Sequence, residues 1–142
     1  MAVDAVYHVS STAAGGGRDG EVVSETGRIA LELRPPVEMG GSGEGSNPEE
    51  LFSAGYAACY LGALRAVAGQ QGVSVPEGTT VKVTVGIGKD SEGGFGLTAA
   101  IETYLPGLDE AQAQALADGA HAFCPYSKAT RGNIEHTVTA RV

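Results

Sequence analysis

The two cysteines are the residues of this chain whose types and surroundings are best suited to chemistry. Cys59 ends the segment Asn47-Pro-Glu-Glu-Leu-Phe-Ser-Ala-Gly-Tyr-Ala-Ala-Cys59, and Cys124 opens the segment Cys124-Pro-Tyr-Ser-Lys-Ala-Thr-Arg-Gly-Asn133. They are the only two cysteines among 142 residues. Two cysteines in the whole chain suit a cycle between thiols and a disulfide better than they suit the cross-linking of a secreted scaffold. The pair therefore indicates thiol redox chemistry.

Each cysteine also has a plainer interpretation, because free cysteines are often buried as small apolar side chains. A reactive thiolate needs a nearby cation or dipole. If Cys59 lies on a helix, its neighbours Tyr56 and Ala63 carry no charge, so an activating charge must come from elsewhere in the chain. Arg18, in a glycine-rich segment, is the best candidate for that charge. The other candidates for it are Arg34, Arg65 and Arg131.

Two further groups of side chains could carry chemistry. Glu49 and Glu50 open a predicted helix, where negative charge complements the helix dipole. One of them could instead hold an arginine through two hydrogen bonds beside a thiol. His121 and Cys124 have the spacing of half a zinc site, but the chain has no second such pair, and structural zinc normally takes four protein ligands. We therefore expect no metal and no cofactor.

Composition limits the partners that this chain can have. The net charge is −8 and the pI is about 4.7. Because an acidic surface repels phosphate groups, we expect no nucleic acid and no membrane as a partner. The first residues do not resemble a signal peptide, and we expect no apolar stretch of the ~20 residues that a membrane span needs. We expect a cytoplasmic protein with one domain over residues 1–142.

Local patterns predict the elements that must position these side chains. Asn47 followed by Pro48 predicts a helix start, and the apolar run over 51–68 predicts a helix buried on most sides. Asp109 predicts the start of a second helix that ends near Phe123. This order of elements predicts an α+β fold. The predicted strands are 2–10, a hairpin of 21–25 and 28–34 joined through Thr26-Gly27, 79–87, 95–105 and 134–142.

These motifs together resemble a known family. The segments that contain Cys59 and Cys124, with the loop Gly-Gly-Arg18-Asp-Gly, closely resemble the organic hydroperoxide resistance (Ohr) branch of the OsmC/Ohr family. The resemblance covers essentially the whole chain. It implies an α+β fold with antiparallel sheets around two central helices. It also implies an intertwined homodimer with two active sites at the subunit interface.

The same resemblance implies a thiol peroxidase that reduces organic hydroperoxides. Cys59 would be the peroxidatic cysteine and Cys124 the resolving one, while Arg18 would stabilise the thiolate and Glu49 would hold Arg18. A Cys59 sulfenic acid would give a Cys59–Cys124 disulfide, which a dihydrolipoyl dithiol on a lipoylated protein would reduce. The apolar residues that would line the substrate pocket, each equally consistent with the core, are Phe52, Tyr56, Phe123 and Tyr126.

Three other functions stay open on the sequence. A peroxidase of the OsmC branch would differ in substrate preference more than in chemistry. A module that binds apolar acids would carry its cysteines incidentally, and it would bind fatty acids without consuming peroxide. A redox sensor would use its disulfide to alter a contact with a partner, although the sequence shows no second module to receive that signal.

Overall fold

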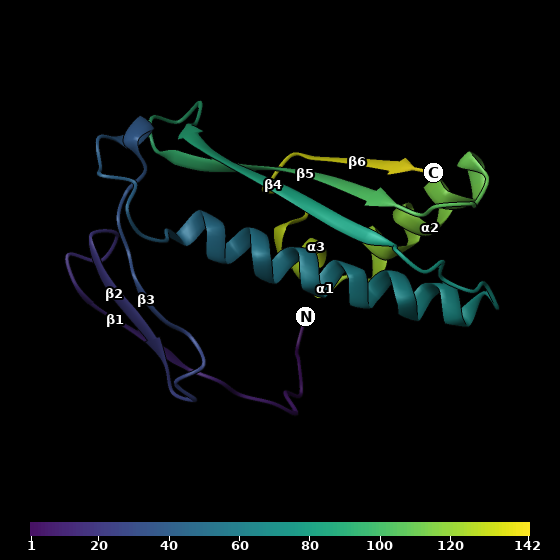
Figure 1. Cartoon of the computed structure of the whole chain (residues 1–142), viewed down its shortest axis with the longest axis horizontal. Coiled ribbons are helices and arrows are strands. Elements are labelled where there is room, and N and C mark those ends of the chain that lie inside the picture. Colours follow the sequence, from purple (N-terminus) through teal and green to yellow (C-terminus); the bar gives the residue numbers. More distant parts are fainter. The chain divides into compact units, whose positions relative to one another are not determined.

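Six strands and three α-helices are distributed over two units of the chain in the computed structural model, which describes residues 1–142. The first unit is Met1–Leu51 and the second is Phe52–Val142 (Figure 1). Each unit contains one three-stranded sheet. The α+β class predicted from the sequence is confirmed, and the expectation of a single domain stays a prediction.

The first unit is built on an antiparallel sheet in the order β1-β2-β3. Its strands are β1 (Ser11–Gly15), β2 (Gly20–Ser24) and β3 (Ala30–Glu32), and a 3-10 helix, η1 (Val37–Met39), follows. The predicted hairpin is confirmed as β2 and β3. Gly27 lies in its turn with φ of +72°, a left-handed conformation that glycine adopts without steric cost.

The predicted strand over 2–10 is wrong. The strand that pairs with β2 is β1, in which Ser11 faces Ser24 and Gly15 faces Gly20. Residues 2–10 belong to no strand, and Val6 is 100% exposed. Alternation of apolar and polar residues shows that a segment can have an apolar face, but it does not supply a surface that covers this face.

The second unit contains a mixed sheet in the order β4-β5-β6. The hairpin of β4 (Thr80–Lys89) and β5 (Phe95–Tyr104) is antiparallel, but β6 (His136–Arg141) pairs with β5 in parallel. The expectation of antiparallel sheets is therefore wrong for this pair. A parallel neighbour requires a crossover connection, and α2 (Glu110–Phe123) with α3 (Pro125–Thr130) provides it.

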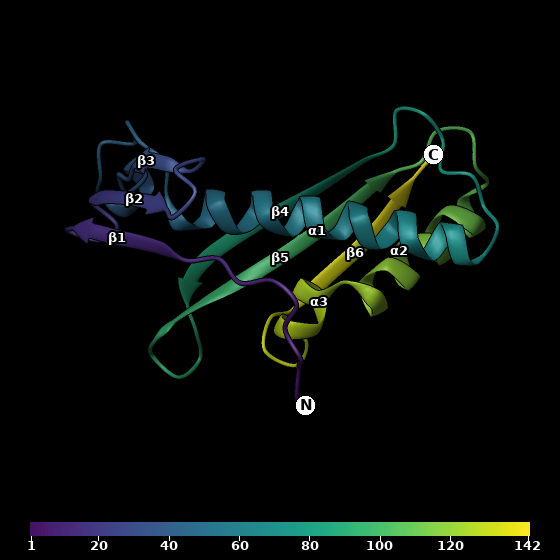
Figure 2. The same cartoon turned by 90° about the horizontal axis from the view of Figure 1, so that it is seen from below.

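The helices of the second unit lie on one face of this sheet (Figures 1 and 2). Alternate residues of the strands point toward them, so that Val83 and Ile101 are buried while Thr84 is exposed. Both predicted helix starts are confirmed. Asn47 Oδ1 accepts a hydrogen bond of 2.8 Å from the backbone N–H of Glu50, and Asp109 caps α2 in the same way.

Helix α1 (Pro48–Gln70) is more exposed and more apolar than the sequence predicted. Its outer face includes Ala54, Ala58 and Gly62, all exposed, so it is not buried on most sides in the single chain. By length and composition α1 could cross a membrane, which corrects the expectation that no stretch is apolar enough. This is weak evidence, because a core helix passes the same test. Its buried residues are Tyr56, Tyr60, Ala63, Leu64, Val67 and Ala68.

Candidate redox site

The second unit brings the two cysteines together. Cys59 lies on α1 and is half-buried, whereas Cys124 is fully buried between α2 and α3. Both are free thiols, and the Cys124 Sγ lies 3.6 Å from the Cys59 Sγ. A disulfide bond is about 2.05 Å long, so an approach of about 1.5 Å would join the two sulfurs. The two thiols are therefore placed for exchange chemistry with each other.

Pro125 explains why Cys124 lies at a break between helices. Proline lacks the N–H that α2 would need in order to continue, and it fits the first turn of a new helix. Cys124 is extended and is at once the last cap of α2 and the first cap of α3. Its backbone N–H donates to the Ala120 carbonyl at 2.8 Å, and its side chain makes no capping hydrogen bond to α3. The thiol is therefore free to face Cys59.

The sequence did not reveal α3. Helix α3 follows Cys124 directly, and its Ser127 is fully buried. The available signal was Pro125, because a proline that ends one helix is also a favoured first residue of the next.

Burial raises the pKa of the Cys59 thiol. The backbone N–H of Tyr126, near the start of α3, opposes this by hydrogen bonding to the Cys59 sulfur and lowering its pKa, while Cys124 raises it further. The net direction of the pKa shift is upward, so the surroundings of Cys59 favour the thiol over the thiolate. Arg131, a cation of this unit, is held by a hydrogen bond of 3.0 Å from its Nη2 to the His121 carbonyl.

Aromatic side chains gather beside Cys59. Phe52 lies two helical turns before it on α1 and stacks on Tyr126, with ring centroids 6.3 Å apart and an interplanar angle of 13°. Tyr56 contacts both rings. Tyr126 is 41% exposed, whereas Tyr56 is fully buried and belongs to the core. Phe123 makes none of these ring contacts and is 51% exposed, so the structure groups three of the four predicted pocket residues.

Arg18 and Glu49 form an ion pair in the first unit. The Arg18 Nη2 lies 2.8 Å from the Glu49 Oε1, and its Nη1 donates to Oε2 at 3.0 Å. Two parallel hydrogen bonds of this kind fix the plane of the guanidinium. The bonds from Arg18 lower the pKa of Glu49, and those to Glu49 raise the pKa of Arg18. Of the two glutamates that could bind an arginine through two hydrogen bonds, Glu49 is the one that binds Arg18.

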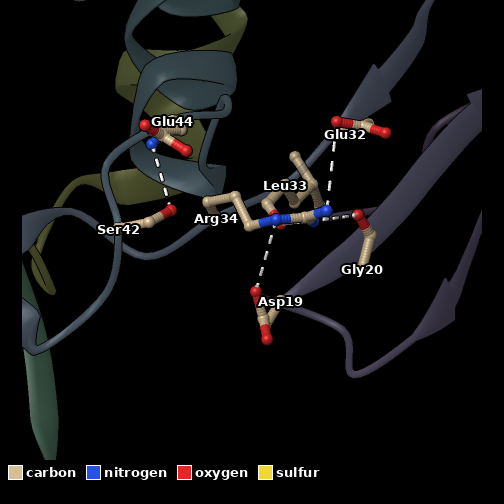
Figure 3. Close-up of polar contacts among 7 residues, drawn as sticks. All are labelled: Asp19, Gly20, Glu32, Leu33, Arg34, Ser42 and Glu44. Atoms are coloured by element: carbon tan, nitrogen blue, oxygen red, sulfur yellow. Dashed lines mark hydrogen bonds and ion pairs between the residues drawn. The ribbon is translucent and has the colours of Figure 1, made fainter.

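The loop that carries Arg18 joins β1 to β2 and is anchored at its end (Figure 3). A Cβ at Gly20 would overlap the Ala14 carbonyl, so only glycine fits there. The Arg34 Nη1 donates to the Gly20 carbonyl at 3.2 Å and to the Leu33 carbonyl at 2.6 Å, while its Nε lies 3.6 Å from Asp19 Oδ1. Arg34 is therefore engaged in holding the loop in which Arg18 lies.

The fold and the site define an α+β protein with two free thiols in contact. Similar sequences and structures are known. The profile of the family described as "OsmC-like protein" matches residues 41–139. The "Organic hydroperoxide resistance protein" of Xanthomonas axonopodis pv. citri (strain 306) is 46% identical over 135 residues, which cover 94% of each chain. "Organic hydroperoxide resistance protein OhrB" of Bacillus subtilis (strain 168) is 41% identical over 121 residues, or 84% of this chain and 88% of that one. The chain belongs to the OsmC-like family.

Solved structures show the same fold. An organic hydroperoxide resistance protein from Legionella pneumophila matches with a TM-score of 0.92 and 40% identity, covering 98% of this chain and all of that one. The structure of OhrB of Bacillus subtilis matches with a TM-score of 0.86 and 38% identity, over 96% of this chain and 100% of that one. The predicted family and the α+β fold of its members are thereby confirmed, whereas the homodimer stays a prediction.

The Arg18–Glu49 pair gives a prediction about ionisation. Because Arg18 favours the charged form of Glu49, Arg18→Ala should raise the pKa of Glu49 toward the ordinary value of about 4.3. The measurement is a titration of the Glu49 side-chain carboxyl by carbon NMR. The matched control is Arg28→Ala, which removes an exposed arginine from the same unit. A Glu49 titration that both variants leave unchanged would contradict the ion pair.

Proposed function

We propose that this protein is a thiol peroxidase that reduces organic hydroperoxides to alcohols through Cys59 and Cys124. The observation that carries the proposal is the 3.6 Å contact between the only two cysteines of the chain. Membership of the OsmC-like family, and the names of its relatives, support a role in resistance to organic hydroperoxides. The cysteine chemistry is the step that we add to this role.

In the first half of the proposed cycle the Cys59 thiolate attacks the terminal oxygen of the hydroperoxide. An S–O bond forms and the O–O bond breaks, so that the sulfur is oxidised to a sulfenic acid and an alkoxide leaves as the alcohol after taking up a proton. In the second half the Cys124 thiol condenses with the sulfenic acid. The S–S bond forms, water leaves, and Cys59 is protected from a second oxidation.

The proposal assigns the activation of Cys59 to Arg18. Burial disfavours the Cys59 thiolate, so a cation is needed to offset it. Arg18 would lower the pKa of the thiol and polarise the peroxide, and Glu49 would orient the guanidinium through its two hydrogen bonds. The exposed ring of Tyr126, with Phe52 stacked on it, would contact the apolar tail of the substrate. Phe123, which lies apart from these rings, would have at most a secondary part in the pocket.

A dithiol must return the disulfide to two thiols by exchange, and we propose a dihydrolipoyl group on a lipoylated protein. We place this cycle in the cytoplasm, where disulfides are mostly transient and functional. We also propose a homodimer. Large apolar side chains near the N-terminus are uncovered in the single chain, with Val3 78% and Tyr7 72% exposed, and exposed apolar surface of this kind marks interaction sites.

Substitution of each cysteine separates the two halves of the cycle. Cys59→Ser should abolish turnover of tert-butyl hydroperoxide with dihydrolipoamide as the reductant, because no thiolate remains at the site of attack. Cys124→Ser should undergo one oxidation and then accumulate the Cys59 sulfinic acid, since no thiol intercepts the sulfenic acid. Peroxide consumption and intact mass measure both outcomes. Full turnover by Cys59→Ser would contradict the assignment of Cys59 as the residue that attacks the peroxide.

The role of Arg18 predicts a shift in the pH dependence. Arg18→Ala should raise the pKa of Cys59, and below that pKa each unit of increase lowers the thiolate fraction about tenfold. The peroxide step should slow accordingly at neutral pH, and its pH profile should move upward. The pH dependence of Cys59 alkylation measures the thiol pKa, with Arg28→Ala as the control. An unchanged thiol titration in Arg18→Ala would remove Arg18 from the mechanism.

A further inference from the structure

Two side-chain bridges connect α1 with the segment that follows α2. The first is the contact between Cys59 and Cys124. The second is a hydrogen bond of 2.8 Å between the Tyr56 Oη and the Ser127 Oγ. On α1, Tyr56 lies three residues before Cys59. On the other segment, Ser127 lies three residues after Cys124. Tyr56 and Cys59 share one face of α1, because residues three apart on a helix lie on the same face. Cys124 caps α3 three residues before Ser127, so the hydroxyl bridge lies next to the thiol contact.

Helix α3 needs such a bridge, because its six residues are too few to form a stable helix alone. Two further residues support it. The Thr130 Oγ1 donates to the Tyr126 carbonyl at 2.9 Å and lies 3.0 Å from the His136 Nε2, which is also 3.0 Å from the Tyr56 Oη. We call Tyr56, Ser127, Thr130 and His136 the Tyr56 network. It joins α1, α3 and β6 at one point.

Burial makes the Tyr56 network favour one arrangement of α1, α3 and β6. Tyr56 and Ser127 are both fully buried, and a buried hydroxyl without a partner is costly. Burial, together with the charge of Arg131, lowers the pKa of His136, which keeps the ring neutral and able to accept a hydrogen bond. Because one arrangement of α1, α3 and β6 satisfies all four side chains, the network favours that arrangement over alternatives.

We propose that the Tyr56–Ser127 hydrogen bond is a positioning contact that holds Cys124 against Cys59 while the disulfide forms. The inference rests on the proposed peroxidase function. In the cycle the Cys59 sulfenic acid has two fates. It condenses with the Cys124 thiol and releases water, or it reacts with a second hydroperoxide to give a sulfinic acid and an alcohol. Tyr56 and Ser127 favour the first fate by keeping the second thiol within reach.

The test measures the partition between these two fates in Tyr56→Phe and Ser127→Ala. Each variant removes one oxygen atom and keeps the helix in which it lies. Both variants lose the Tyr56–Ser127 hydrogen bond, and Tyr56→Phe also loses the contact with His136. Loss of the shared bond should slow disulfide closure about five- to tenfold, and the sulfinic fraction per turnover should rise by the same factor. Rapid-quench mass spectrometry separates sulfenic acid, disulfide and sulfinic acid. Because both changes break the same bond, the double variant should be little worse than the more affected single variant.

The matched control is Thr103→Val, which removes a buried hydroxyl without a hydrogen-bond partner from β5. It should leave the partition as in the unchanged protein, even if it alters the free energy of unfolding. A partition equal to that of the unchanged protein in both Tyr56→Phe and Ser127→Ala would overturn the positioning role. Failure of the unchanged protein to oxidise Cys59 at all would instead overturn the proposed function. If one variant does not fold, the other alone decides.

Discussion

The contact between Cys59 and Cys124 is the interaction on which the proposed chemistry depends. The two sulfurs are 65 residues apart in the chain and 3.6 Å apart in space. Helix α1 supplies one of them, and the break between α2 and α3 at Pro125 supplies the other. The core beneath them, which includes Tyr60, Leu64 and Leu116, keeps these helices on one face of the β4-β5-β6 sheet. This apolar setting keeps the two thiols close without joining them.

That same setting works against the chemistry that we propose. Burial raises the pKa of Cys59, and one backbone N–H from Tyr126 offsets only part of this effect. The charge that could restore the thiolate belongs to the first unit, where Glu49 fixes the guanidinium of Arg18 and Arg34 anchors the loop. In the proposed mechanism, therefore, an apolar unit holds the two sulfurs and a glycine-rich loop carries the cation.

The sequence predicted the features that depend on neighbouring residues. Asn47 and Asp109 revealed two helix starts because a cap acts within one turn, and Thr26-Gly27 revealed a hairpin for the same reason. The parallel direction of β6, the lack of a strand over 2–10 and the burial of Ser127 depend on contacts distant in sequence, so local patterns could not reveal them. The motifs also named the cysteines, Arg18 and Glu49. Spacing could not show that the thiols touch, nor that Tyr56 uses its hydroxyl as well as its ring.

The most direct test of the central claim is the addition of one equivalent of an organic hydroperoxide to the fully reduced protein, followed by thiol counting and intact mass. The account predicts the loss of both thiols, a mass lower by two hydrogens, and a peptide that links Cys59 to Cys124. Retention of both thiols after this treatment would contradict the account, because it would leave the two cysteines as parts of the core with no redox role.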